Sequence, residues 1–329
     1  MKVLSLFDGI ACGYEALKRA WIPFTHYYAS EIDKHAITVA TTNHPDIIEM
    51  GDVNDRQTWP LDWIDLIFGG SPCQWFSMAG KMLNFNDPRS ALFFKFVDIV
   101  KYYKPKYFLL ENVKMKKDFI NIINEQLWGI TPTLIDSALV SAQSRKRLYW
   151  FGKLQPDGTY AKVEIPQPED KGVTLKDILQ EVVDEKYILT EKQVNMIANW
   201  WGFEDPIATM KWPDDKMWTL TTHCGKMSNW IKLIRWRPEM PYEPGHRRLK
   251  YKTYTEKCPT LTTTCASGDQ KNVILNGDVI RKLTPIECER LQTLPDNYTE
   301  GISDTKRYFA LGNWRTVDVI AHIFSLLDY

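Results

Sequence analysis

Short apolar runs alternate with amphipathic segments along the first 150 residues of the chain. Runs of four or five apolar residues, each ended by glycine or a polar residue, are typical of buried strands, and we expect such strands at residues 3–7, 27–30, 64–68 and 107–110. Apolar positions with helical spacing predict helices over residues 14–20, 33–42 and 90–103. This alternation predicts an α/β fold with a doubly wound, mostly parallel sheet.

Polar residues stand where several of these strands end. Asp8-Gly9 follows the first strand, Glu31 the second, Ser71-Pro72-Cys73 the third and Glu111 the fourth. Ligands of such sheets bind beyond the carboxyl ends of the strands. We therefore expect these residues to belong to one functional site.

The pattern changes after residue 153. Proline, tryptophan, threonine and basic residues dominate, which predicts a second, smaller and irregular β-rich domain. Thr219–Cys224 and Thr260–Cys265 repeat one motif, which indicates a duplicated loop or strand. An apolar helix over residues 317–327 is expected to return to the sheet. We thus expect one domain from residues 1–152 plus 306–329, and another from residues 153–305.

Composition and charge narrow the class of protein. The 329 residues carry 41 basic and 41 acidic side chains, so net charge does not favour nucleic acid. Residues 225–257 are locally basic and aromatic, which suits a phosphate backbone and equally suits a solvated charged face. No signal peptide or membrane span is expected. Six scattered cysteines without C-x-x-C pairs argue against a zinc ribbon or a disulfide scaffold and favour a reducing cytoplasm.

The first strand–turn–helix segment favours an adenosine-type ligand. Its glycines, Gly9 and Gly13, permit close approach of the backbone, but the Lys-Ser/Thr of a phosphate loop is absent. Glu31 could hydrogen-bond a ribose diol, and Asp52 could hold an adenine amino group. Each carboxylate taken alone could equally be a helix cap or a surface residue.

Cys73, Glu111 and two arginines form a candidate reactive group. A thiolate, a carboxyl group that shares a proton, and the guanidiniums of Arg145 and Arg147 suit addition to an electron-poor ring. The arginines could lower the pKa of the thiol and hold a carbonyl or phosphate. The alternative for Cys73 alone is a buried structural cysteine.

Taken in order, the motifs identify a resemblance. They are Phe7-Asp-Gly-Ile-Ala-Cys-Gly13, Glu31, Gly51-Asp52, Gly70-Ser-Pro-Cys-Gln74, Glu111-Asn112-Val113, Gln143-x-Arg145-x-Arg147, Arg281–Gln292 and Gly312-Asn313. In this order the chain resembles the DNA (cytosine-5)-methyltransferases over nearly its whole length, with features of the bacterial, phage and de novo branches.

The resemblance implies a fold, a methyl donor and residue roles. It implies a Rossmann-like methyltransferase domain that binds S-adenosylmethionine, releases S-adenosylhomocysteine and needs no metal. Cys73 is implied to add to C6 of a flipped-out cytosine, Glu111 to engage N3, Arg147 to contact the O2 side and Arg145 to support the catalytic loop. The implied donor-binding residues are Phe7, Asp8, Gly9, Ile10, Glu31, Ile32, Asp52, Val53, Pro72, Asn313 and Trp314.

The resemblance also implies how DNA is held. The loop from Gln74 to Lys81 would close over the flipped base, and residues 153–280 would form the target-recognition region. Thr219-Leu220 and Thr260-Leu261 both fit its Thr-Leu pair; we favour the second because it lies nearer the following motif. The implied DNA contacts are Gln74, Trp75, Ser77, Lys81, Gln143, Thr260, Leu261, Arg290 and Gln292.

Two positions depart from the family pattern. Trp75 stands where many relatives have a small residue, and it could stack on DNA or pack internally. Trp314-Arg315 follows Gly312-Asn313, where relatives have a small residue beside the donor. This pair could alter donor affinity or donor choice, since a donor with an extra carboxylate could pair with Arg315.

Three interpretations remain open from the sequence. The first is an active methyltransferase of restriction–modification or phage self-protection, acting as a monomer on double-stranded DNA in the cytoplasm of a bacterial or phage-infected cell, with a cognate nuclease acting separately. The second is a catalytically silent or donor-altered DNA-binding homologue. The third is an RNA cytosine-5 methyltransferase, against which the absence of a Cys-Phe-Thr triplet argues.

Overall fold

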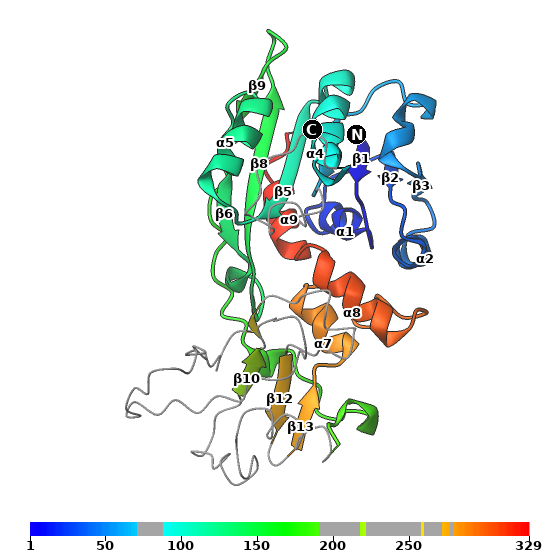
Figure 1. The fold of residues 1–329 in the computed structure, drawn as a ribbon, viewed down its shortest axis with the longest axis vertical. Helices are drawn as coiled ribbons and strands as arrows, with labels where there is room; N and C mark the ends of the chain where they lie inside the picture. Colours follow the sequence, from blue (N-terminus) through cyan, green and yellow to red (C-terminus); the bar gives the residue numbers. More distant parts are fainter. Residues whose placement is uncertain (71–87, 191–217, 222–257, 260–271, 277–278, 329) are drawn as a thin grey trace. The chain divides into compact units, whose positions relative to one another are not determined.

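The computed structural model describes residues 1–70, 88–190, 218–221, 258–259, 272–276 and 279–328 (Figure 1). The chain forms two compact units. The first comprises residues 1–140, 146–171 and 314–329, and the second comprises residues 141–145 and 172–313.

An eight-stranded mixed sheet forms the centre of the first unit. Its strands, in spatial order, are β3 (Ile48–Glu49), β2 (His26–Ser30), β1 (Lys2–Leu6), β4 (Leu66–Gly69), β5 (Tyr107–Val113), β8 (Lys146–Leu154) and β6 (Thr133–Asp136), with β9 (Tyr160–Lys162) paired to β8. Strands β3, β2, β1, β4 and β5 are parallel to one another, and β8 runs antiparallel to β5 and β6. The doubly wound, mostly parallel sheet predicted from the sequence is confirmed.

Helices cover both faces of this sheet. They are α1 (Cys12–Arg19), α2 (Lys34–Asn43), α4 (Pro88–Tyr103), α5 (Lys117–Gln126) and α9 (Val317–Phe324), with 3-10 turns η1 (Val53–Thr58) and η2 (Ser137–Leu139). Helix α2 begins after Asp33, whose carboxylate accepts hydrogen bonds from the backbone of His35 and Ala36. Such a cap satisfies amide groups that have no partner within the helix.

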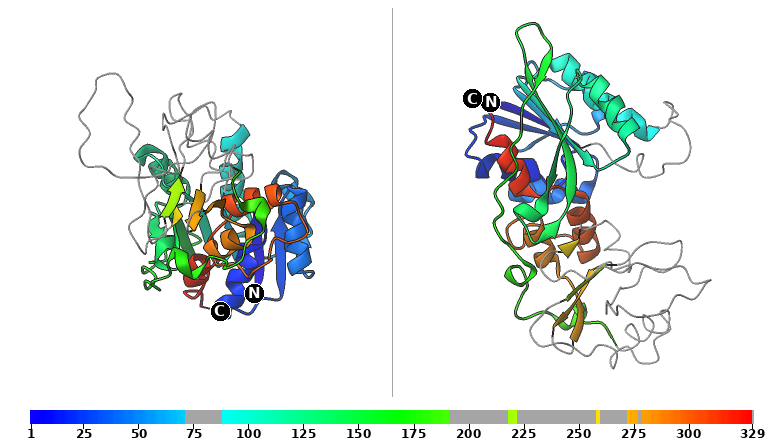
Figure 2. Two further views of the ribbon diagram at one scale, coloured as in Figure 1. Left: turned by 90° about the horizontal axis from the view of Figure 1, so that it is seen from below. Right: turned by 90° about the vertical axis from the view of Figure 1, so that its left-hand side faces the viewer.

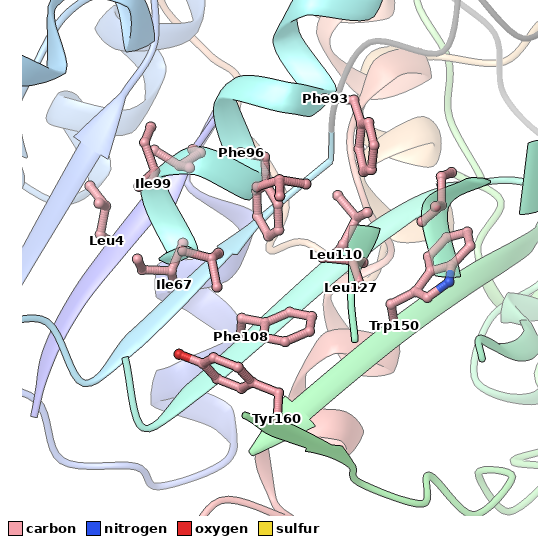
Figure 3. Close-up of a cluster of buried hydrophobic side chains, with 14 of the residues drawn as sticks. Leu4, Ile67, Phe93, Phe96, Ile99, Phe108, Leu110, Leu127, Trp150 and Tyr160 are labelled. Carbon is pink, nitrogen blue, oxygen red and sulfur yellow. The ribbon is translucent and has the colours of Figure 1, made fainter. Parts of the chain in front are cut away.

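The main core lies between the sheet and α4 (Figure 3). Phe93 and Phe96 of α4 pack with Ile67, Phe108 and Leu110 of the central strands, and all five side chains are at most 3% exposed. Burial of aromatic and branched side chains stabilises such a layer by about 1.5–3 kcal/mol for each side chain. This packing explains why the central strands are apolar on both sides.

Helices α1 and α9 cover the opposite face, so that α4 and α9 flank the sheet (Figure 2, right). Phe324 of α9 meets Phe68 of β4 edge to face, with ring centroids 5.3 Å apart. Phe68 also occupies the space that a Cβ atom at Gly13 of α1 would need. The return of the last helix to the sheet, expected from its apolar pattern, is therefore confirmed.

The second unit contains small sheets and two short helices. Strands β10 (Trp218–Thr221), β12 (Asn272–Asn276) and β13 (Val279–Lys282) form an antiparallel sheet, and β11 (Cys258–Pro259) pairs with β7 (Gln143–Ser144). The helical elements are η3 (Leu175–Asp177), η4 (Glu185–Tyr187), α7 (Pro285–Leu291) and α8 (Asp304–Asn313). Thr219-Leu220, one of the two candidate Thr-Leu pairs, lies within β10. Thr260-Leu261 lies outside the described residues.

Most expected boundaries differ from the structure by one to three residues, and three of the differences bear on the site. Strand β1 ends at Leu6, because Phe7 has a positive φ of 56° that no strand accommodates. Helix α1 begins at Cys12 rather than Tyr14. Strand β5 continues through Glu111 to Val113, because these residues pair with β8. Glu111 is therefore held within a strand instead of following one.

In the described part of the chain, no helix is both long and apolar enough to span a bilayer. The same residues contain no group of three or more histidine, cysteine or acidic side chains arranged to hold a metal ion.

Candidate active site

A left-handed loop, residues 7–11, connects β1 to α1 and is called here the Gly9 loop. Phe7, Gly9 and Ala11 have positive φ values of 56°, 69° and 59°. Non-glycine residues adopt this conformation at a cost, and it is typical of functional turns. The Gly9 loop therefore has a shape that the surrounding contacts must maintain.

Glu31, at the end of β2, maintains the Gly9 loop. Its Oε2 atom accepts a hydrogen bond of 2.9 Å from the Gly9 amide. Its Oε1 atom accepts from the amides of Ile32 and Asp33, at 2.8 and 2.9 Å. The backbone thus fixes the carboxylate at the carboxyl ends of β1 and β2, where the sequence predicts it. Ile32 beside it is 71% exposed and offers an apolar surface.

Asp8 is a buried acid of the Gly9 loop. It is 1% exposed, and the hydroxyl of Tyr27 donates a 2.5 Å hydrogen bond to its Oδ1 atom. Burial raises the pKa of Asp8, because loss of water disfavours the ionised carboxylate. Its Oδ2 atom has no hydrogen-bond partner among the described residues. Asp8 therefore has an unused acceptor at the carboxyl end of the sheet.

Glu49, at the end of β3, is a further acid that the sequence analysis did not identify. Burial, and then the charges of Asp8 and Glu31, raise its pKa from 4.5 to about 7. Neither of its carboxyl oxygens has a hydrogen-bond partner in the described part of the chain. A signal did exist, because Glu49 ends a neighbouring parallel strand just as Glu31 does.

Asp52 has a local structural role in addition to the predicted ligand contact. Its Oδ1 atom accepts from the backbone and side-chain amides of Asn54, both at 2.9 Å, and so caps η1. Val53 begins η1 and is 4% exposed, and Ile10 of the Gly9 loop is fully buried. These two apolar side chains support the backbone of the site from within.

Glu111 lies between two guanidinium groups. The Nε atom of Arg147 is 3.1 Å from its Oε1 atom, and the Nε atom of Arg315 is 3.5 Å from its Oε2 atom. The register explains the first contact: Glu111 pairs with Tyr149, so Arg147 is its diagonal neighbour on the same face. This contact brings together two residues of the candidate reactive group, and Arg315 adds a second cation.

Two glycines make room for residues 314 and 315. A Cβ atom at Gly9 would lie 2.2 Å from the indole of Trp314. A Cβ atom at Gly70, after β4, would lie 2.6 Å from Oε2 of Glu111 and 2.7 Å from Nη2 of Arg315. Trp314 therefore covers the Gly9 loop, while Arg315 and Glu111 meet over Gly70.

Several predicted site residues lie in the second unit and support its backbone. Both Nη atoms of Arg145 are 3.3 Å from the carbonyl oxygen of Gly312, at the end of α8. Gln292 donates to the Leu311 carbonyl at 2.6 Å and also lies 3.4 Å from the Gln143 amide. Gln143 and Gln292 are fully buried and brace the α7–α8 region in this structure.

The remaining predicted residues of the second unit are at the surface or beyond the described residues. Asn313 is exposed at the end of α8. Arg290 pairs with Asp296 at 2.5 Å and donates to the Ile178 carbonyl at 3.0 Å. The predictions that lie outside the described residues are those for Pro72, Cys73, Gln74, Trp75, Ser77, Lys81, Thr260 and Leu261.

The arrangement combines two chemical functions. Around the Gly9 loop, Asp8, Glu31 and Glu49 offer carboxyl oxygens, which suit a ligand that carries positive charge and hydroxyl or amino donors. Over Gly70, Glu111 offers a carboxyl group held by two cations, which suits hydrogen bonding to the edge of a base. Sequence reasoning noted Arg315 as a departure from the family pattern and as a possible partner of a donor carboxylate, but not its contact with Glu111, because that contact depends on folding.

Comparison with known proteins places this site in a family. The family of C-5 cytosine-specific DNA methylases matches residues 1–327. Methyltransferase M.HpaII of Haemophilus parainfluenzae, a type II enzyme, is 30% identical over 89% of this chain and 80% of its own length. Orphan methyltransferase M.SPRI of Bacillus phage SPR is 28% identical over 99% of this chain and 97% of its own length.

Solved structures show the same fold at lower identity. Entamoeba histolytica methyltransferase EhMeth superposes with a TM-score of 0.65 at 17% identity, covering 98% of this chain and 96% of that one. S. pombe Dnmt2 methyltransferase gives 0.64 at 20% identity, covering 99% and 98%. With a family match over almost its entire length, the chain belongs to the C-5 cytosine-specific DNA methylases.

Proposed function

We propose that this chain transfers a methyl group from S-adenosylmethionine to C5 of a cytosine that is flipped out of double-stranded DNA. The observation that supports this most directly is Glu111, held by Arg147 and Arg315 over Gly70, three residues before Cys73. Family membership makes cytosine the expected base. The C5 and C6 atoms of a stacked base cannot be reached, so the base must leave the duplex.

The residues around the Gly9 loop fit the proposed donor. S-adenosylmethionine carries a sulfonium and an ammonium charge, a ribose diol and an adenine amino group. The loop region offers the matching acceptors: a buried Asp8 oxygen, two buried Glu49 oxygens and the carboxylates of Glu31 and Asp52. We assign Glu31 to the ribose, Asp52 to the adenine amino group and Ile32 to the adenine face. When bound, the donor supplies an electrophilic methyl group.

The remaining assignments concern the amino-acid part of the donor and the rest of its binding site. We propose that the backbone of Phe7, Asp8, Gly9 and Ile10 approaches the amino-acid part of the donor, since Gly9 permits that approach. Val53, Pro72, Asn313 and Trp314 complete the proposed set. Of these, Trp314 has direct support, because its indole already covers Gly9.

The chemistry on the base is assigned to the chain's own side chains. We propose that the Cys73 thiolate adds to C6 of the cytosine. Meanwhile the carboxyl group of Glu111 forms a hydrogen bond with N3 and shares a proton with that nitrogen. This makes C5 nucleophilic, and loss of the C5 proton after transfer releases the thiolate. Arg147 orients Glu111 and faces the O2 side of the ring. We assign Arg145 to support of the catalytic loop; in the structure its two Nη atoms contact the Gly312 carbonyl at the end of α8.

DNA recognition is assigned to the second unit and to the segment after Cys73. We propose that Gln74, Trp75, Ser77 and Lys81 close on the flipped base, and that Thr260-Leu261 contributes to target recognition within residues 153–280. Arg290 would exchange its exposed partner Asp296 for a phosphate group of the DNA backbone. We propose duplex DNA as the substrate, a monomeric chain and a nuclease partner that acts separately.

A covalent trap tests this proposal. Fluorine at C5 of the target cytosine cannot leave as the proton does, so the Cys73 adduct should persist as a protein–DNA cross-link. We expect the wild-type chain to cross-link, Cys73→Ser to lose both cross-link and transfer, and Cys288→Ala to retain both. Bisulfite sequencing of DNA from expressing cells supplies the target sequence for the duplex. Transfer that survives in Cys73→Ser would contradict the mechanism.

A further inference from the structure

Arg315 is a buried cation with an unused donor. The residue is 4% exposed, and its Nη1 atom has no hydrogen-bond partner among the residues that the structure describes. Its ion-pair contact in that part of the chain is the 3.5 Å approach of Nε to Glu111. An unsatisfied buried guanidinium donor is costly, so this position is suited to an anionic group that arrives with a ligand.

The charges around Arg315 do not neutralise it. Glu111 is shared with Arg147, whose Nε atom is the nearer of the two at 3.1 Å. Asp8 is within electrostatic reach of Arg315, and burial raises the pKa of this acid by more than the charge of Arg315 lowers it. Glu31 is fixed by backbone amides of its own surroundings, and the pKa of Glu49 is raised by burial and by the charges of Asp8 and Glu31. Two guanidiniums thus share a single firmly paired carboxylate.

The position of Arg315 indicates which part of a ligand would meet it. Trp314, its neighbour in sequence, covers Gly9 of the loop to which the proposed function assigns the donor. Arg315 itself meets Glu111, which the proposed function assigns to the base. The guanidinium therefore joins the donor side of the site to the base side. A group that moves from donor to base must pass through this region.

We propose that Arg315 selects a sulfonium donor whose transferable carbon bears a carboxylate, so that the chain can add a carboxymethyl group to C5 of cytosine. This inference rests on the proposed function and deepens it. The S–CH2 bond breaks, and the electron pair leaves with sulfur as S-adenosylhomocysteine. The C5–CH2 bond forms, and the C5 proton is lost to solvent as the thiolate is released. The carboxylate stays on the transferred group and remains paired with Arg315.

Binding measurements without DNA test the selection. The probes are S-adenosylmethionine and its S-carboxymethyl counterpart, titrated by calorimetry into the wild-type chain and into Arg315→Met and Arg315→Lys. We expect the wild type to prefer the carboxymethyl donor. Arg315→Met should reduce that preference by about tenfold or more, the size of one charge-assisted hydrogen bond, and Arg315→Lys should retain part of it.

A substitution at another ion-paired arginine of the first unit serves as the control. Arg19 of α1 pairs with Asp318 at 2.6 Å and is not assigned to the donor or to the base, so Arg19→Met should leave the preference unchanged. Thermal denaturation of each variant shows whether it is folded, and Arg315→Lys keeps the test informative if Arg315→Met unfolds. Nucleoside mass spectrometry after incubation with both donors together should show carboxymethylcytosine in excess over methylcytosine.

Other outcomes would overturn the inference in distinct ways. If Arg315→Met weakens both donors equally, the anion at Arg315 is the amino-acid carboxylate common to both. If neither affinity changes, Arg315 serves Glu111 alone. If the wild type binds S-adenosylmethionine and cross-links DNA but excludes the carboxymethyl donor, the inference fails while the proposed function stands. If the chain binds neither donor and forms no cross-link, the proposed function fails as well.

Discussion

The cluster around Glu111 and the Gly9 loop differs from the polar network of α7 in how completely its buried acids are paired. Both α7 acids, Glu287 and Glu289, are fully buried. Arg281 contacts Glu287 with two nitrogens at 2.7 and 2.8 Å, and backbone amides of Thr284 and Gln180 complete its shell. Around the Gly9 loop, in contrast, carboxyl oxygens of Asp8 and Glu49 lack partners within the described chain, as does one nitrogen of Arg315; in the α7 network the acids are fully paired, and Nε of Arg281 is the atom without a partner among the described residues.

This difference distinguishes structural from functional polar groups. Glu289 is likewise surrounded, by Arg307 and by the backbone of Asn297 and Thr299. A buried acid with every oxygen occupied holds its fold together, and removing it leaves the partner cation stranded. Buried groups with unused donors or acceptors cost stability, and such a cost is typical of a site that a ligand completes.

The largest effect is expected at Glu111. The isosteric substitution Glu111→Gln removes the proton-sharing carboxyl group, so the transfer rate should fall about 10²–10⁴-fold. Rates are measured with tritiated donor on the target duplex, and calorimetry checks that the donor still binds. Glu164→Gln, an exposed acid paired with Lys162 in the same unit, is the control and should transfer normally. A rate within a few-fold of wild type in Glu111→Gln would remove the contrast.

The second effect concerns stability in α7. Glu287→Gln leaves the buried Arg281 without its carboxylate, so the free energy of unfolding should fall by about 3–5 kcal/mol. Urea denaturation followed by far-UV circular dichroism measures it. Asp296→Asn breaks the exposed pair with Arg290 and should cost no more than about 1 kcal/mol. Equal losses in the two variants would show that burial and pairing do not determine how much each ion pair contributes to the free energy of unfolding.

The third effect tests the fit of Trp314 on the Gly9 loop. Gly9→Ala meets both a positive φ of 69° and an indole at 2.2 Å, so unfolding free energy should fall by about 1–3 kcal/mol, with loss of donor binding. Gly158→Ala is the control, because Gly158 has a φ of 82° with no neighbour within 4 Å and therefore reports the backbone cost alone. Similar destabilisation of both variants would mean that the Trp314 side chain moves aside at little cost in free energy.

The smallest effect is a pH dependence at Glu49. Its pKa is raised from 4.5 to about 7, so the folded chain binds more protons than the unfolded chain between those values. This contribution to stability is present at about pH 4.5 and is lost as pH rises to about 7. Glu49→Gln cannot ionise, so the difference in melting temperature between it and wild type should grow in its favour over that range. A constant difference would contradict the raised pKa.

The sequence predicted much of the first unit and less of the site. Strand ends were predictable because apolar runs of this length must be buried, and they placed Glu31 and Asp8 at the proper edge. The shape of the Gly9 loop was not predictable, because the positive φ of Phe7 depends on the Glu31 contact with Gly9. Gln143 and Gln292 were predicted at DNA by resemblance, whereas their burial depends on how α7 and α8 pack.

What the sequence determined by itself is the alternation of strands and helices, the order of the motifs and hence the family. These properties are local or patterned, and they are visible in apolar spacing and in short runs of residues. Only the tertiary structure decided that Arg315, 204 positions after Glu111 in the chain, shares its carboxylate with Arg147, and that Trp314 covers Gly9. Charge balance in a buried site is a sum over neighbours in space, which a linear pattern does not contain.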